Sequence, residues 1–180
     1  MYNIFEEIGE EFHNAKLDKL DFPDDIMEKI LSWSIKPIGI FYFASNPGVG
    51  KTYLTGAFLN EWKKRKLFCR RFDERGLLAY LRLAHKEGHD YCYSLRNLCE
   101  CQYFILDDLG TCKDSEWQKE ILFDLIDTRW SSRKPTIITS NLSISELEER
   151  YEERLVSRLK DVRNLCIQIH GHDRRQIESV

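Results

Sequence analysis

Residues 38–54, IGIFYFASNPGVGKTYL, join an apolar run, a glycine-containing turn and the start of a helical pattern. The apolar run predicts a buried strand over Ile38–Ala44, and the pattern after the turn predicts a helix over Lys51–Lys64. Gly48 and Gly50 allow backbone N–H groups to curl around a phosphate without a Cβ clash. The helix N-terminus adds partial positive charge there. The stretch therefore predicts a phosphate-binding loop, or P-loop.

This loop is expected to hold ATP and its Mg²⁺ ion. Lys51 would reach the β- and γ-phosphates, and the Thr52 hydroxyl would ligate the metal. Ser45 stands where such loops usually begin with glycine, and we expect tolerance because this position shapes only the start of the turn. The competing interpretation is a chance glycine turn that caps a helix. The predicted ATP-binding residues are Ser45, Asn46, Pro47, Gly48, Val49, Gly50, Lys51, Thr52 and Tyr53.

Two carboxylates follow a second apolar run in YFILDDLG, residues 103–110. Asp107 and Asp108 stand at the carboxyl end of the predicted strand. We expect Asp107 to hold the magnesium shell through water, and Asp108 to orient or deprotonate the attacking water. The alternative is an acidic turn after a buried strand.

A third apolar run, in PTIITSNLS at residues 135–143, also ends in polar residues. Asn141 is expected to bond the γ-phosphate or the attacking water. In the plainer interpretation, Asn141 simply precedes Ser143, which with Glu146 forms a capping box for the next helix.

Arg154 and Arg158 lie four residues apart in RYEERLVSRLKD, on one predicted helical face. The planar fork of arginine can bridge a γ-phosphate, and such a residue can come from a neighbouring subunit. Surface pairing with Glu152, Glu153 or Asp161 explains the arginines equally well.

Short apolar runs alternate with helical patterns along the chain, which predicts an α/β fold with a five-stranded, mostly parallel sheet flanked by helices. Two further helices are expected before the first core strand. The predicted strands are 38–44, 67–72, 103–107, 136–140 and 165–170, and the predicted helices are 2–15, 24–33, 51–64, 74–85, 115–131 and 143–160, the last broken.

The bulk composition is that of an ordinary globular protein of 180 residues, 42% hydrophobic and 32% charged. Its net charge of −3 excludes a uniformly basic nucleic-acid coat. No apolar run is long enough to span a membrane, and the acidic start does not resemble a signal peptide. We therefore expect a cytoplasmic protein whose six cysteines are reduced thiols, with Cys69 and Cys166 acting as small hydrophobes within strands.

These motifs, in this order and spacing, resemble the AAA+ ATPases of the DnaC/IstB group, which contains bacterial helicase loaders and transposition helper ATPases. The segments ILDDLG, TSNLS and RLVSRL are the most specific, and the resemblance covers roughly residues 35–175. It implies a P-loop NTPase fold with an AAA+ core, Asn141 as sensor 1, and Arg158 as the arginine finger, with Arg154 as its substitute. Arg174 or Arg175 falls where loaders carry an arginine that senses nucleotide; a solvated basic tail is the alternative.

The resemblance is incomplete at the N-terminus. Residues 1–34 are expected to form a helical segment and residues 35–180 the AAA+ domain, without a helical lid and without the separate helicase-binding region of DnaC-type loaders. An apolar stripe on the first helix could dock on a helicase or pack on the protein's own core. It consists of Ile4, Phe5, Ile8 and Phe12.

Two weaker patterns remain. The basic stretch 63–71, KKRKLFCRR, either complements a helix dipole or, with the arginines near 174, contacts single-stranded DNA. The His- and Cys-containing segment 85–101 has no CxxC pair, so a non-metal interpretation is favoured over zinc. Potential zinc ligands there are His85, His89, Cys92, Cys99 and Cys101.

The function predicted from the sequence is Mg²⁺-dependent ATP hydrolysis by a helicase loader. ATP would bridge protomers of a homo-oligomer acting on a DnaB-type replicative helicase and single-stranded DNA. An isolated subunit is expected to hydrolyse ATP slowly. Alternatives are an IstB-like transposition helper ATPase and an ATP-binding adaptor with little hydrolysis.

Overall fold

The computed structural model describes residues 8–86, 91–112 and 115–174. Five strands form one sheet in the order β2-β3-β4-β1-β5, and all the paired strands run parallel. The α/β class and the five-stranded sheet are therefore confirmed. The strands are β1 (Ile40–Ser45), β2 (Cys69–Asp73), β3 (Tyr103–Leu109), β4 (Thr136–Ser140) and β5 (Leu165–Ile169).

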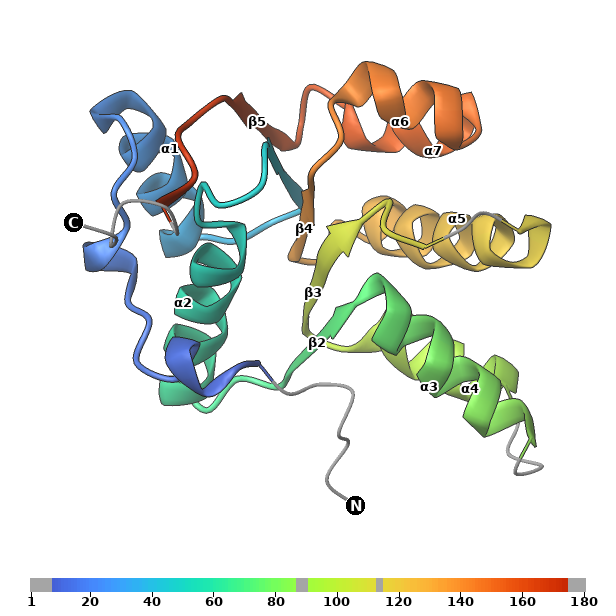
Figure 1. Cartoon of the computed structure of the whole chain (residues 1–180). Coiled ribbons are helices and arrows are strands. Elements are labelled where there is room, and N and C mark those ends of the chain that lie inside the picture. The colour runs from blue at the N-terminus through green and yellow to red at the C-terminus, as the bar shows by residue number, and fades with distance from the viewer. Residues whose placement is uncertain (1–7, 87–90, 113–114, 175–180) are drawn as a thin grey trace.

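Helices cover both faces of the sheet (Figure 1). The helices α1 (Asp24–Ile35) and α2 (Lys51–Lys64) lie on one face, together with the short 3₁₀ helices η2 (Glu10–Phe12) and η3 (Leu17–Lys19). The other face carries α3 (Glu74–Lys86), α4 (Tyr91–Glu100), α5 (Glu116–Ser131), α6 (Ile144–Arg150) and α7 (Glu153–Leu159). None of the described helices has the length and apolarity needed to cross a membrane.

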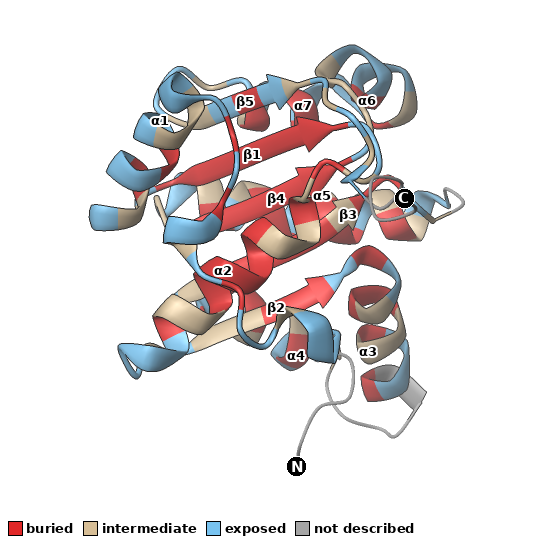
Figure 2. Cartoon of the chain, turned by 60° about the vertical axis from the view of Figure 1, so that its left-hand side comes forward, coloured by how far each residue is buried: buried red, intermediate tan, exposed pale blue. Residues whose placement is uncertain are grey.

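Strand β1 is buried along its whole length because it lies between β4 and β5 in the sheet (Figure 2). Phe41 and Phe43 belong to the core beneath α1 and α2, whereas Tyr42 and Ala44 belong to the opposite core. This two-sided burial explains the continuous apolar run in the sequence. The edge strand β5 differs: Cys166 lies within this strand, as predicted, but it is exposed and so does not act as a hydrophobic core residue.

The predicted helix over residues 2–15 is wrong within the described residues. From residue 8 onward this segment contains only the single 3₁₀ turn η2 before it continues as loop. The Asn60 side chain on α2 donates to the carbonyl oxygens of Phe12, His13 and Ala15, and so holds the segment in an irregular path. Ile8 is buried in the α2-side core, so this part of the apolar stripe packs on the protein itself.

The other three residues of the predicted N-terminal stripe have different outcomes. Phe12 is half-buried against the same core, while Ile4 and Phe5 lie outside the described residues.

The second predicted helix is confirmed as α1, which extends to Ile35. Packing of Ile30 and Trp33 joins α1 to the core around Phe41.

Helix α4 was missed at the sequence level. Its Leu95, Leu98 and Cys99 have helical spacing and pack into the core that contains α3 and α5. No helix was predicted over residues 91–100, where zinc binding was only weighed and not favoured. The predicted break in the last helix is confirmed, because α6 ends at Arg150 and α7 begins at Glu153. The capping box of Ser143 and Glu146 is also present.

A buried arginine joins three elements on the α5 side of the sheet. Arg129 on α5 is fully buried and donates to the carbonyl oxygens of Leu98, Cys99, Cys101 and Pro135 at 2.8–3.2 Å. It therefore supplies donors to the C-terminus of α4, where the last carbonyl groups lack helical partners. Its Nε also donates to Thr136 on β4.

We expect Arg129→Ala to lower the free energy of unfolding by about 3–5 kcal/mol, because several buried carbonyl groups lose a charged donor worth about 1–3 kcal/mol each. Urea unfolding followed by circular dichroism measures this change. The matched control is Arg96→Ala, since Arg96 has a 75% exposed side chain and, among the described residues, pairs with Glu100 on its own helix. Similar unfolding midpoints for the two variants would contradict the expectation.

Candidate functional site

A cavity of about 460 Å³ opens where the turn after β1 meets the ends of β3 and β4. Five segments that are distant in the sequence contribute to it: the irregular N-terminal segment, the turn with the start of α2, the carboxyl end of β3, and the residues after β4 and β5. Its lining residues are Phe12, Lys19, Leu20, Asp21, Phe22, Pro47, Gly48, Gly50, Lys51, Thr52, Tyr53, Asp108, Asn141 and Arg174.

The predicted loop has the backbone geometry of a phosphate cradle. Gly48 and Gly50 have φ values of 80° and 112°, in the left-handed region that L-residues with a Cβ rarely adopt. Helix α2 begins directly after Gly50, so its N-terminal N–H groups lie at the cavity. Lys51 is buried, and its Nζ donates to the carbonyl oxygens of Ser45 and Asn46 at 2.9 and 3.1 Å.

Three of the nine predicted loop residues do not line the cavity. Ser45 is buried behind the loop, with its carbonyl oxygen bonded to Lys51. Val49 belongs to the α2-side core. Asn46 forms two reciprocal hydrogen bonds with the backbone of Gly171, at 2.7 and 3.1 Å. These residues shape the loop from behind, and their contribution to ATP binding stays a prediction.

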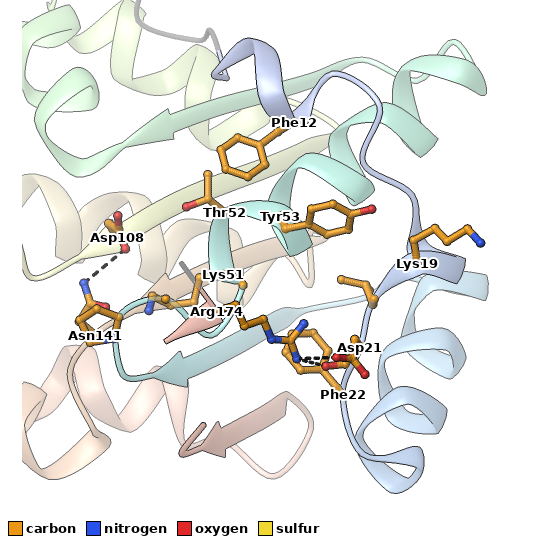
Figure 3. Close-up of a pocket in the computed structure, with 14 residues that line it drawn as sticks. Phe12, Lys19, Asp21, Phe22, Lys51, Thr52, Tyr53, Asp108, Asn141 and Arg174 are labelled. Carbon is orange, nitrogen blue, oxygen red and sulfur yellow. Dashed lines mark hydrogen bonds and ion pairs between the residues drawn. The ribbon is translucent and has the colours of Figure 1, made fainter. Parts of the chain in front are cut away.

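Asp108 and Asn141 lie side by side at one end of the cavity (Figure 3), and Asn141 Nδ2 donates to Asp108 Oδ1 at 3.5 Å. Asp108 has φ 56°, unusual for a residue with a Cβ, and stands where the β3–β4 register shifts. Its backbone N–H donates to the Thr139 hydroxyl at 3.0 Å. Burial raises the pKa of the Asp108 carboxyl, and the neighbouring Asp107 charge raises it further, whereas Lys51 opposes the shift.

Asp107 has a different position. Its carboxylate is buried and accepts from Thr139 Oγ1 at 2.5 Å, from Thr55 Oγ1 at 3.1 Å and from Arg71 Nη2 at 2.6 Å. It does not belong to the cavity lining, although Asp108 does. Asp107 therefore anchors the end of β3, and its role in a magnesium shell stays a prediction.

The Arg71 pair also corrects the interpretation of the basic stretch. Arg71 is buried beside Asp107, so it does not extend a DNA-binding surface. This occurs because Arg71 occupies an interior-facing position on β2, which pairs with β3. Residues 63–66 are exposed at the end of α2, as a surface basic patch requires.

Three residues of an apolar wall were missed as part of the site, whereas the fourth, Tyr53, was predicted with the loop. Phe12, Leu20, Phe22 and Tyr53 line the cavity beside the loop. A planar base could pack against aromatic side chains of this kind. Phe12 was singled out as part of an apolar stripe, but no sequence pattern connects residues 12–22 with a turn some thirty residues later.

Arg174 lies at this wall and connects the segment after β5 with the N-terminal segment. Its guanidinium forms an ion pair with Asp21 at 3.4 Å and lies 5.5 Å from the ring centre of Phe22. The Arg174 backbone N–H donates to Gly48 O at 3.1 Å. The expected nearness of Arg174 to a nucleotide is thus compatible with the geometry, while Arg175 lies outside the described residues.

The remaining candidates lie elsewhere. Arg158 does not line the cavity; it lies on α7 against α5. Arg154 pairs with Glu152 on the surface. Within residues 8–86, 91–112 and 115–174, no group of three His, Cys, Asp or Glu side chains is arranged to hold a metal, and His89 lies outside these ranges.

The arrangement suits a nucleoside triphosphate with a divalent cation. Left-handed glycines and a helix N-terminus favour phosphate oxygens, and the Thr52 hydroxyl offers an oxygen ligand of the kind that Mg²⁺ prefers. Asp108 and Asn141 lie together on the opposite side, where a water could be oriented.

Helicase loaders named DnaC are similar in sequence to much of the chain. The replicative helicase loader DnaC of Escherichia coli strain K12 is 25% identical over 124 residues, which is 68% of this chain and 51% of that protein. DnaC of Buchnera aphidicola from Acyrthosiphon pisum is 22% identical over 178 residues, covering 94% of this chain and 72% of the relative. The chain thus spans about half the length of the Escherichia coli relative.

Solved structures share the fold. A crystal structure of the DnaC helicase loader superposes with a TM-score of 0.74 at 27% identity, covering 89% of this chain and all of that one. The replication initiator DnaA bound to AMPPCP and single-stranded DNA gives a TM-score of 0.74 at 19% identity over 86% of this chain and 50% of that one, a likeness of fold alone.

A family profile covers the same core. The profile described as "IstB-like ATP binding protein" matches residues 39–163, which include the P-loop, both aspartates, Asn141 and Arg158. The chain belongs to the IstB-like ATP-binding protein family, within the DnaC/IstB group of AAA+ ATPases.

Proposed function

We propose that this chain hydrolyses ATP with Mg²⁺ and acts as a replicative helicase loader. The observation that carries the proposal is the convergence of Lys51, Thr52, Asp108 and Asn141 on one cavity. These residues come from three strand ends of a parallel sheet, where ligands of such folds bind. The cavity volume also lies within the ordinary range for small-molecule sites.

In this proposal, the phosphates occupy the turn formed by residues 47–50. Lys51 exchanges its bonds to the loop carbonyl groups for bonds to the β- and γ-phosphates. Thr52 would hold the metal, and Asp107 would support its water shell. A bound Mg²⁺ would neutralise the negative charge that develops on the phosphates.

The base lies against the apolar wall formed by Phe12, Leu20, Phe22 and Tyr53. Asp108 orients the attacking water and accepts its proton, for which its raised pKa is favourable. Asn141 holds the same water or the γ-phosphate by its amide. The positions of these side chains around the cavity support each of these assignments.

Arg158 completes the site of a neighbouring protomer. It belongs to the family-matched region yet lies away from the cavity of its own chain, which is the arrangement expected of a finger acting in trans. ATP would then couple assembly to hydrolysis on a DnaB-type helicase and single-stranded DNA. The likeness to DnaC loaders supports this partner class.

We expect Lys51→Ala to weaken ATP binding by roughly 10–100-fold, because a charged donor to the phosphates is lost. Asp108→Asn should bind ATP within about threefold of the wild type, while turnover falls about 100-fold or more. Calorimetry and phosphate release measure the two steps, with Lys63→Ala on the far end of α2 as control. Unchanged turnover in Asp108→Asn would contradict its role as base.

The trans finger predicts that turnover per subunit rises with protein concentration. Arg158→Ala should remove this rise, since arginine fingers contribute about 10³–10⁵ in rate. ATP binding to the isolated subunit should persist. A dilute monomer with full turnover, unaffected by Arg158→Ala, would exclude this part of the proposal.

Partner identity is tested by co-purification with candidate DnaB-type helicases in the presence of ATP or ADP. We expect a nucleotide-dependent complex that Lys51→Ala abolishes, with phosphate release stimulated by single-stranded DNA. Capture of a transposase instead, with assembly on duplex DNA, would identify a transposition helper. A protein that binds ATP but releases no phosphate with helicase and DNA would be an adaptor.

A further inference from the structure

Two side chains of α5 hold the Arg158 guanidinium. Arg158 Nε lies 2.6 Å from Asp127 Oδ1, and the guanidinium carbon lies 4.4 Å from the ring centre of Trp130. The Trp130 indole is itself fixed, because its N–H donates to Asp161 Oδ2 at 2.8 Å. The arginine is thus held at one edge and supported on one face.

The terminal nitrogens of Arg158 remain unused in the described part of the chain. Its hydrogen bond and ion pair there involve Nε, and neither Nη1 nor Nη2 has a hydrogen-bond partner among these residues. The side chain is 27% exposed. The two terminal N–H₂ groups are the ones that a phosphate of another molecule can accept from.

Arg154, one turn earlier on α7, is arranged differently. Its Nε and Nη2 both donate to Glu152 Oε2, at 3.0 and 2.6 Å, and the guanidinium lies over Phe123. Its fork is therefore engaged by a neighbouring carboxylate, whereas Asp127 engages only the inner edge of Arg158. This difference distinguishes the two arginines that the sequence left as alternatives.

We propose that Asp127 is a positioning residue for the arginine finger. Its carboxylate holds Arg158 Nε, and Trp130 supports the guanidinium plane, so that Nη1 and Nη2 are presented to the triphosphate of a neighbouring protomer. This inference rests on the proposed trans action of Arg158. Immobilising a free arginine on assembly costs side-chain entropy, which would lower the rate by a factor of roughly 10–30. The contacts with α5 already restrict Arg158 before assembly.

The test compares Asp127→Asn with Asp124→Asn. Asp124 lies one turn earlier on α5 and is exposed, so its substitution makes the same charge change without touching Arg158. At a protein concentration that saturates the rate, we expect kcat of Asp127→Asn to fall about 10–30-fold, with KM for ATP within about twofold. Asp124→Asn should match the wild type, and Asp127→Glu should recover part of the loss.

A mixing experiment separates a positioning defect from damage to the fold. Asp127→Asn subunits retain an intact ATP site, and Lys51→Ala subunits retain an intact finger. Mixed assemblies should therefore regain turnover, because the fingers of the Lys51→Ala subunits serve the sites of the others. Thermal melting of each variant accompanies the assay.

The outcomes are distinguishable. If Arg158→Ala loses turnover while Asp127→Asn stays within twofold of the wild type, the positioning role is overturned and the trans finger stands. An equal loss in Asp124→Asn, or no recovery on mixing, also overturns the role of Asp127. If Arg158→Ala keeps full turnover, or the wild type has none, the proposed function fails and the inference fails with it.

Discussion

The buried carboxylate of Asp107 is the interaction on which the candidate site depends. It joins Arg71 on β2, Thr139 on β4 and Thr55 on α2 to the end of β3. A buried charge is costly unless it is paired and hydrogen-bonded, and here both oxygens have partners. This cluster places the next residue, Asp108, at the cavity with a left-handed backbone. Asp107 thus fixes the end of β3, and Asp108 lines the cavity.

The same sheet end gathers groups from both termini of the described chain. The N-terminal segment crosses α2 and supplies the apolar wall, while the segment after β5 bonds to Asn46 and Gly48 from the other side. The Arg174–Asp21 pair joins the two segments over the cavity. Elements outside the sheet therefore decide the shape of the pocket, whereas the sheet decides where its polar groups stand. Arg158, held on α5, belongs to a separate surface.

Much of the fold could be read from local patterns. The β4 bounds and the α2 bounds agree with the prediction, because a strand buried on both faces is a short continuous apolar run, whereas the helix is a longer segment that starts at the phosphate turn. Helix α4 was not predicted, although its apolar residues have helical spacing. The first predicted helix is wrong from residue 8 onward, where the segment packs on α2 and Asn60 bonds its carbonyl groups. Arg71 appeared basic and exposed in the sequence, yet its partner Asp107 lies on the neighbouring strand.

The sequence by itself determined the phosphate turn, the strand ends that carry Asp108 and Asn141, and the family of the chain, since these depend on residues close together in the sequence. Only the tertiary structure decided which residues face the cavity. The strand order, the separate positions of Asp107 and Asp108, the apolar wall from residues 12–22 and the Asp127–Arg158 contact depend on packing between distant segments. No local periodicity encodes such contacts, because they arise only when the sheet brings the segments together.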